Sequence, residues 1–445
     1  MDFLKRRGCP VKTDGSSRGK VRAVSILFMG LAHLLYFRQY LKGLLFAAAE
    51  IVMLVLSPFF VRKLRDLITL GSPQPELPVK LRDNSVFMLI DGVMVCAVLA
   101  VFFALYVLSV KSALASYETF CVLKKHPGKQ AGRRISGNSF PVFGLAPTVL
   151  LVLFFVVVPL VFSACAAFTN YASPNHIPPN NTVDWVGFEN FSDLFGGEAA
   201  WTSALGRVAL WTLIWGLSAT LTCYFGGLFL AVLLQESRLR IAPVFRGIFI
   251  LPYAVPSVVS VLVWKNLLNG SFGIVNRTLM ELGWISAPIP WLSDTLLAKF
   301  MCIFVNLWAG FPYFMLLTLG TMTAISPDVY EAARIDGANR AQVFRKITLP
   351  LVMYQTTPLM IMSFTHNINN FGAIFFLTGG MPKVSDSTIT AAGGTDILVT
   401  WIYQLTVNLL KYNYAAVVAV LLFLVIAPFA ILNFRRTKSY REGEL

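Results

Sequence analysis

Eight apolar stretches, each about as long as a lipid bilayer is thick, decide what this chain can fold into. Crossing the hydrocarbon core takes about 20 apolar residues in a helix, and a backbone inside lipid must satisfy its own hydrogen bonds. Hydrophobic residues make up 56% of the chain and charged residues 13%, which is too apolar for a soluble domain. The sequence therefore predicts an all-α polytopic membrane protein with eight transmembrane helices, at residues 43–61, 86–110, 143–168, 204–234, 244–264, 299–324, 351–377 and 414–434.

A further apolar run, residues 24–37, is too short to cross a bilayer. Basic residues gather in the loops that stay in the cytosol, and residues 111–139 contain six Lys or Arg. If residues 24–37 crossed, this basic segment would lie outside the cell. We therefore predict that they form a re-entrant or interfacial segment, with both chain termini in the cytosol. Residues 62–85 disagree with this order, because they would lie outside with five basic residues.

The net charge of +15 comes from such loops and does not indicate a nucleic-acid surface. The six cysteines are scattered without a CxxC pair, so we expect them to pack as small apolar residues and not to bind metal. The sequence has no G-x-x-x-x-G-K-[ST] phosphate loop and no catalytic grouping of Cys, His and Asp. We expect no enzyme activity and no bound cofactor in this chain.

The clearest polar helix signal occupies residues 326–350, between two predicted spans. Ser326 and Pro327 suit the N-cap and first turn of a helix, and Gly337 suits the left-handed residue that ends it. A second helix is predicted at 338–347. The stretch is therefore predicted to form a helix-turn-helix knob outside the bilayer.

This stretch resembles the coupling loop of ATP-driven (ABC-type) import permeases. The pattern is E-A-A, three residues, Gly, nine residues and I-x-L-P, filled here by Glu331, Ala332, Ala333, Gly337, Ile347, Leu349 and Pro350. The resemblance implies that Glu331, Ala332, Ala333 and Gly337 couple the chain to a cytosolic ATPase subunit. The alternative is an ordinary amphipathic cytosolic loop.

From about residue 143 onward, the chain is similar to the larger permease subunit of bacterial maltose and maltodextrin importers. The motifs that carry this resemblance are AFTNYASPN at 167–175, LPYAVPS at 251–257, VNLWAGFPYFM at 305–315 and SFTHNINNFGAIFFLTGG at 363–380. It implies a permease core with six transmembrane helices at 141–445. Residues 1–140 would then form an N-terminal extension with the interfacial segment and two helices.

The same resemblance implies the partners and the location of the chain. The partners would be a second homologous permease subunit, two copies of a cytosolic ATPase subunit that bind ATP and Mg, and an extracellular or periplasmic sugar-binding protein. The assembly would lie in the bacterial cell (plasma or inner) membrane as a multi-pass complex.

Polar side chains that recur at helical spacing inside apolar spans are candidates for a substrate site, because such groups are costly in lipid. Three sets meet this description: Tyr253 and Ser257; Asn306, Gly310 and Tyr313; and Ser363, Asn367 and Asn370. Amides and hydroxyls both donate and accept hydrogen bonds, and aromatic faces cover apolar sugar faces. The alternative is that these groups only hold helices together. The family places its sugar contacts at the matching positions, which favours a sugar site.

Each candidate has an expected role. We expect the amides of Asn306, Asn367 and Asn370 to bind sugar hydroxyls, Ser257 and Ser363 to extend this network, Tyr253 and Tyr313 to lie against ring faces, and Gly310 to leave room for the sugar. His366 is expected to be a packing residue.

The predicted function is the translocating subunit of an ATP-driven oligosaccharide importer, with maltose or maltodextrin as the expected substrate. An external binding protein would deliver the sugar, and alternating access would move it. An ion-coupled secondary sugar transporter is the alternative. That mechanism needs acidic side chains inside the spans, and Glu50 and Asp91 in early spans are its only candidates.

Overall fold

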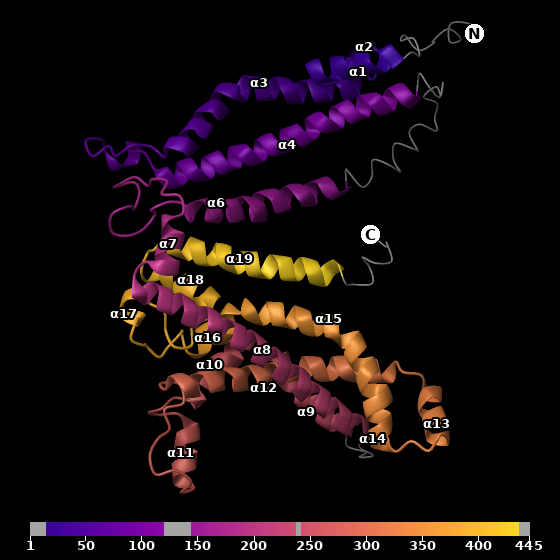
Figure 1. The fold of residues 1–445 in the computed structure, drawn as a ribbon, viewed down its shortest axis with the longest axis vertical. Helices are drawn as coiled ribbons and strands as arrows, with labels where there is room; N and C mark the ends of the chain where they lie inside the picture. Colours follow the sequence, from indigo (N-terminus) through magenta and orange to yellow (C-terminus); the bar gives the residue numbers. More distant parts are fainter. Residues whose placement is uncertain (1–14, 120–143, 237–241, 436–445) are drawn as a thin grey trace. The chain divides into compact units, whose positions relative to one another are not determined.

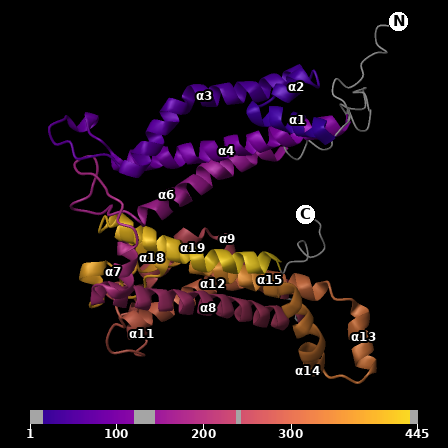
Figure 2. The ribbon, with the colours of Figure 1, turned by 45° about the horizontal axis from the view of Figure 1, so that its top comes forward.

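The computed structural model describes residues 15–119, 144–236 and 242–435, which form helices and turns with one isolated β-bridge, between Thr169 and Trp185. The chain divides into two compact units, Met1–Trp185 and Val186–Leu445. Figures 1 and 2 show the helices of each unit. The predicted division at residue 140 was drawn from a family resemblance, whereas these units are defined by packing. The predicted division therefore stays a prediction.

Within the described residues, seven helices are long and apolar enough to cross a membrane: Tyr40–Thr69, Val79–Tyr117, Gly144–Ala166, Ala199–Gln235, Thr295–Thr323, Arg340–Ile368 and Tyr412–Arg435. Each of them overlaps a predicted span. The remaining predicted span, 244–264, consists of two helices, α9 (Ala242–Ala254) and α10 (Ser257–Leu267), which are bent by 92° where they meet. The all-α multi-pass class is confirmed, whereas the number of crossings stays a prediction.

The first unit contains two long neighbouring helices, α3 (Tyr40–Thr69) and α4 (Ser85–Tyr117), joined through a short 3-10 turn at Val79–Leu81. After residue 143, the chain continues through a π-helical turn at Leu153–Val157 into α6 (Val158–Ala166). Figure 1 draws these helices in indigo and purple.

The short apolar run before these helices forms α1 (Gly15–Leu27) and α2 (Leu31–Leu35). At about 1.5 Å per residue, neither helix could span a hydrocarbon core of about 30 Å. The turn between them is fixed from both long helices, because Glu50 on α3 accepts the Met29 N–H and Tyr106 on α4 donates to the Ile26 carbonyl. This agrees with a segment that does not cross, while its interfacial or re-entrant placement stays a prediction.

Three of the basic residues that conflicted with the predicted order, Arg62, Lys63 and Arg65, lie inside α3 and not in a loop. Lys63 Nζ forms an ion pair with Asp91 on α4 at 2.7 Å. The helix pair therefore neutralises part of this charge.

The second unit is built around the crossing of α8 (Ala199–Glu236) and α12 (Thr295–Thr323). A Cβ on Gly227 would lie 2.6 Å from the Met315 nitrogen, so only glycine lets the two backbones approach this closely. The buried core beside the crossing includes Trp215, Cys302 and Ile374. The other helices of the unit are α7 (Glu189–Gly196), α11 (Ile274–Glu281), α13 (Pro327–Ile335), α14 (Arg340–Val343), α15 (Leu349–Ile368), α16 (Phe371–Leu377), α17 (Ser387–Thr390), α18 (Leu398–Val407) and α19 (Tyr412–Arg435).

Two π-helical turns, Leu153–Val157 and Phe344–Thr348, each end two residues before a proline, Pro159 or Pro350. Proline has no N–H, and its ring crowds the carbonyl four residues earlier. A wider turn takes up this misfit without ending the helix. The helix from α14 to α15 is therefore continuous.

Two predicted helix boundaries are wrong. The first is wrong because of the continuous helix just described, and the second because of a cap inside a predicted span. No separate helix exists at 338–347, because the helix that begins at Arg340 runs on to Ile368. The span predicted at 351–377 ends at Ile368, because Asn370 caps a new helix, α16. In Figure 1, α13 and α14 lie at one end of the second unit, and α7 and α17 lie at the other.

Candidate functional site

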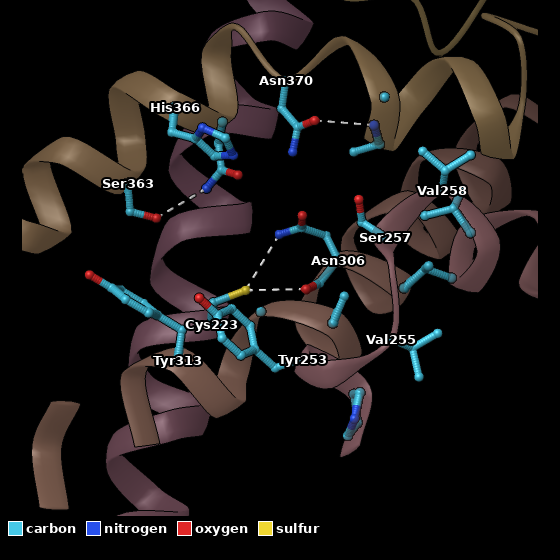
Figure 3. Close-up of a pocket in the computed structure, with 18 of the residues that line it drawn as sticks. Cys223, Tyr253, Val255, Ser257, Val258, Asn306, Tyr313, Ser363, His366 and Asn370 are labelled. Carbon is cyan, nitrogen blue, oxygen red and sulfur yellow. Dashed lines mark hydrogen bonds between the residues drawn. The ribbon is translucent and has the colours of Figure 1, made fainter. Parts of the chain in front are cut away.

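The second unit contains a cavity of about 810 Å³, bounded by residues of α8, α9, α10, α12, α15 and α16. All eight candidate substrate residues line it: Tyr253, Ser257, Asn306, Gly310, Tyr313, Ser363, Asn367 and Asn370. None of its lining residues is Asp, Glu, Lys or Arg. Figure 3 shows Ser257 and Asn306 on one side of this space and Ser363, His366 and Asn370 on another. The cavity is therefore polar but carries no fixed charge.

The sharp bend between α9 and α10 brings Tyr253 and Ser257 to the cavity. Proline disfavours a helical conformation at the residue before it, and Pro256 follows Val255 at the break. Tyr253 thus lies near the end of one helix and Ser257 begins the next. The prediction that they share one helix face is wrong. Such irregular backbone at membrane depth is tolerated where it lines a cavity.

A second break separates Asn370 from the other candidates of its set. Ser363 and Asn367 lie on α15, whereas Asn370 is the N-cap of α16, where its Oδ1 accepts the Ala373 N–H at 3.2 Å. Of this set, only Ser363 and Asn367 therefore lie on one helix at the predicted spacing. The cap fixes the direction of α16, which supplies further cavity wall.

The Asn367 side chain is only 5% exposed and holds α15 against α8. Its Nδ2 donates to Thr220 Oγ1 at 3.0 Å and reaches Ser363 Oγ at 3.5 Å. The backbone carbonyl of Asn367 accepts the Trp215 indole N–H at 2.9 Å. These contacts fit the alternative to a sugar contact, in which the polar side chain only holds two helices together.

Asn306 and Gly310 face α8 through the same neighbour, Cys223. Asn306 Nδ2 donates to Cys223 Sγ at 3.4 Å, and the thiol donates to the Asn306 carbonyl at 3.4 Å. Because sulfur is a weak acceptor, the partly exposed Asn306 amide keeps hydrogen-bonding capacity for a ligand. A Cβ on Gly310 would lie 2.7 Å from Cys223 Sγ. Gly310 therefore makes room for α8; it also lines the cavity, and its expected role of leaving room for the sugar stays a prediction.

Two tyrosines border the open part of the cavity. Tyr253 is 55% exposed and Tyr313 is 39% exposed, and their ring centroids are 6.3 Å apart. Figure 3 shows them below Asn306 and Cys223. Their exposed faces can cover the apolar face of a bound ring.

His366 is the cavity residue that the sequence argument missed. It is exposed and lines the cavity, so its assignment as a packing residue is wrong (Figure 3). It lies three residues after Ser363, and residues at this spacing share a helix face. That spacing was the signal that could have found it.

The predicted knob has the expected first helix and turn. The Ser326 hydroxyl accepts the Asp328 N–H at 3.4 Å, and α13 follows. Gly337 has φ of +77° and ends the helix, with Ala338 N–H bonded to the Ala333 carbonyl and Gly337 N–H to the Arg334 carbonyl, both at 3.0 Å. These two bonds make a Schellman motif with the glycine in its left-handed position.

Of the four predicted coupling residues, Glu331, Ala332 and Gly337 are exposed, while Ala333 is buried. The helix after the turn begins with a capping box, in which Gln342 N–H donates to Asn339 Oδ1 at 2.9 Å and Asn339 N–H to Gln342 Oε1 at 2.8 Å. The turn is therefore defined from both sides.

Broken helices around an uncharged polar cavity, with a rigid polar knob at one end of the bundle, define a membrane transport subunit. Residues 223–438 match the family described as binding-protein-dependent transport system inner membrane component. The chain belongs to this family of permease subunits, which are multi-pass proteins of the inner membrane. The resemblance read from the coupling motif is confirmed.

Several relatives cover almost the whole chain. It is 37% identical over 413 residues to the galactooligosaccharides transport system permease protein GanP of Bacillus subtilis, which covers 92% of this chain and 95% of that protein. It is 33% identical over 440 residues to the maltodextrin transport system permease protein MalC of Streptococcus pneumoniae, covering 97% and 98%. These relatives are transport subunits, in agreement with a non-catalytic role.

A solved structure shares the fold. It is a chain from a bacterial ABC transporter involved in the import of the acidic polysaccharide alginate, with a TM-score of 0.55 and 22% identity, covering 70% of this chain and 100% of that one. At this identity, the likeness concerns the fold alone.

Proposed function

We propose that this chain is the translocating subunit of an ATP-driven importer of neutral oligosaccharides. The observation that carries the proposal is the cavity of about 810 Å³, lined by amides, hydroxyls and aromatic rings without a fixed charge. A neutral sugar needs groups that both donate and accept, and an uncharged wall offers no counter-ion to an acidic or basic substrate. The names of the near-full-length relatives support the same substrate class.

Within the cavity, five side chains are the main proposed sugar contacts. Asn306, Ser257 and Ser363 would bind hydroxyls, and Tyr253 and Tyr313 would cover ring faces. Asn367 and Asn370 line the same space, but each also has a structural hydrogen bond, so we assign them a shared role. His366 is added to the set as an exposed donor and acceptor on the same wall.

Maltodextrin is the first proposed substrate, from the motifs of the membrane core and from MalC. A galactooligosaccharide is the second candidate, favoured by the 37% identity to GanP. Uptake of labelled maltotriose in competition with unlabelled maltotriose or galactotriose separates the two. The sugar that competes at the lower concentration is the preferred substrate.

The proposed assembly contains a second homologous permease subunit, two cytosolic ATPase subunits carrying ATP and Mg, and an external sugar-binding protein. The chain itself would bind no cofactor. The knob at residues 326–350 would dock on the ATPase through Glu331, Ala332, Ala333 and Gly337. Two observations support this docking: the E-A-A and Gly motif, and the hydrogen-bonded turn around Gly337.

Ion coupling within this chain is not favoured. Its two candidate acids have partners in the first unit, since Asp91 is paired with Lys63 at 2.7 Å and Glu50 accepts the Met29 N–H. Neither residue belongs to the cavity.

The test is labelled maltotriose uptake by cells that carry Asn306→Ala, divided by the amount of assembled complex. One lost hydrogen bond to an uncharged sugar costs about 0.5–1.5 kcal/mol, so we expect KM to rise up to about tenfold. Asn266→Ala is the control, because Asn266 is exposed near the end of α10 and lies outside the cavity lining. Equal KM values for both variants and the wild type would refute the assignment of this cavity as the sugar site.

A further inference from the structure

One face of α8 holds a segment that lies next to the cavity helix α16. Three side chains spaced four residues apart, Arg207, Trp211 and Trp215, each donate to backbone carbonyls of the chain after residue 366. The Trp211 indole N–H binds the Thr395 carbonyl at 3.0 Å, and the Trp215 indole N–H binds the Asn367 carbonyl at 2.9 Å. Because this spacing is one turn of helix, the three contacts follow one another along α8.

Arg207 makes the most contacts of the three. Its Nη2 donates to Asp386 Oδ1 at 2.6 Å and to the Ala392 carbonyl at 3.1 Å, and its Nη1 donates to the Gly393 carbonyl at 2.7 Å. Asp386 is only 9% exposed. The guanidinium therefore binds one carboxylate and two backbone carbonyls at once.

The segment bound by Arg207, residues 378–397, is closed on itself, and we call it the strap. Thr378 and Thr395 share a hydrogen bond of 2.7 Å between their hydroxyls, and the Thr395 N–H donates to the Gly380 carbonyl at 3.1 Å. A Cβ on Gly380 would lie 2.3 Å from Asp396 Oδ1, so the loop packs without room for a side chain there. The strap is therefore tied together by its own hydrogen bonds and close packing.

The strap begins where α16 ends, and α16 is cavity wall. Asn370, Gly372, Ala373 and Phe376 line the cavity, while Ile374 and Leu377 pack into the core with Trp211 and Trp215. A shift of the strap along α8 would move α16 and the side chains it presents to the cavity.

We propose that Arg207 is a positioning residue for the cavity, which holds the strap on α8 and thereby fixes α16 at the substrate wall. The effect on sugar binding rests on the proposed function. The hold of Arg207 on the strap, which we call the clamp, rests on the geometry alone. Arginine is required because its planar fork carries several donors in fixed directions, whereas the lysine ammonium is a single compact centre. The strap lies at the end of the second unit that is opposite to α13 and α14, so the cavity wall is set from that end (Figure 1).

The first test is the sugar concentration dependence of labelled maltotriose uptake, with the full chain in its complete importer. We expect Arg207→Lys to raise KM at least fivefold while the maximal rate per assembled complex stays within twofold. Asp386→Asn keeps both carbonyl contacts and should raise KM about twofold. Arg277→Lys, at an exposed arginine on α11, is the matched control and should leave KM unchanged. A merely structural arginine would lower the amount of complex without a change in KM, and that result would overturn the inference.

If Arg207→Lys fails to assemble, Asp386→Asn decides, and an unchanged KM in that variant overturns the inference. A second readout does not depend on sugar. In an Ala373→Cys chain, the rate of alkylation by N-ethylmaleimide is followed at that peptide by mass spectrometry. Arg207→Lys should change this rate at least threefold and Arg277→Lys should not, and equal rates in all chains contradict the clamp. If the wild type takes up neither maltotriose nor galactotriose, the proposed function fails, while the alkylation result still decides the clamp.

Discussion

Asn367 on α15 and Thr220 on α8 share a hydrogen bond of 3.0 Å, with side chains only 5% and 2% exposed. Asn367→Ala removes this bond and leaves a small void, so we expect the complex to lose about 1–3 kcal/mol of stability. The measurement is the melting midpoint of the purified complex together with its amount in membranes. Thr220→Val should cost stability as well, and the two changes combined should cost less than their sum. Native stability with a strongly raised KM in Asn367→Ala would instead make the amide a sugar contact alone.

The approach of Gly310 to Cys223 gives a second prediction. Gly310→Ala places a methyl group 2.7 Å from Cys223 Sγ, which should destabilise the complex by about 1–3 kcal/mol. Cys223→Ala in the same chain should restore most of this loss, because the next atom, Cys223 Cβ, is an ordinary 3.6 Å away. Gly206→Ala on α8 has no atom within 4 Å of the added methyl group and is the neutral control. Thermal melting of the four chains checks the order, and the absence of rescue would show that the glycine serves another purpose.

The turn at Gly337 gives a prediction about coupling. Its φ of +77° strains any β-branched residue, so Gly337→Val should cost about 1–2 kcal/mol locally and redirect the helix that follows. We expect ATP hydrolysis by the complex to separate from maltotriose uptake. Gly283→Val is the matched control, since Gly283 has φ of +70° but lies in the turn after α11. A normal ratio of ATP hydrolysed to sugar moved in Gly337→Val would refute the coupling role.

Asp396 in the strap gives a prediction about pH. The residue is 1% exposed, and burial raises the pKa of its carboxyl from 3.8 to about 6, although a hydrogen bond from the Gly393 N–H opposes this shift. Between these two values the folded protein binds more protons than the unfolded chain, so its free energy of unfolding increases as pH falls from 7 to 5. Asp396→Asn has no such proton to bind. The melting midpoint of the wild type should therefore rise relative to that of Asp396→Asn over this range, and parallel curves would contradict the prediction.

The predicted order of crossings can be tested with two single cysteines in a cysteine-free chain. Ser72 is exposed in the loop after α3, whereas Ser136 lies outside the described residues. With both termini inside and residues 24–37 not crossing, an impermeant thiol reagent added to intact cells should label Ser72→Cys and spare Ser136→Cys. The reverse pattern would invert the N-terminal third of the chain.

The sequence predicted the spans because apolar length is a strong signal, and it predicted the knob because Ser326 and Gly337 are specific helix boundaries. It placed all eight candidates on one cavity, since intramembrane polar groups rarely occur without a reason. It could not show the breaks at residues 255–256 and 369–370, because both sets of residues fit a continuous helix by spacing.

The role of Gly310 was equally hidden. Helical periodicity shows which face a residue shares, but not which neighbour meets that face. Cys223 lies 87 positions earlier in the chain, and only the crossing of α8 and α12 brings its sulfur against Gly310. The partner of Asn367 was hidden for the same reason, because Thr220 also lies on α8, far from Asn367 in the sequence.

The helix from Arg340 to Ile368 links the knob to the cavity without a break in its hydrogen bonding, although it bends between α14 and α15 (Figure 1). Ser363 lies roughly 21 Å along α15 from its first residue, Leu349, at about 1.5 Å per residue. A tilt of α15 by about 8° about Leu349 would therefore move Ser363 by about 3 Å, the length of a hydrogen bond. If the knob docks on an ATPase as proposed, a movement there would reach the cavity through this one helix, in which Pro350 and Pro358 are the positions where bending is easiest.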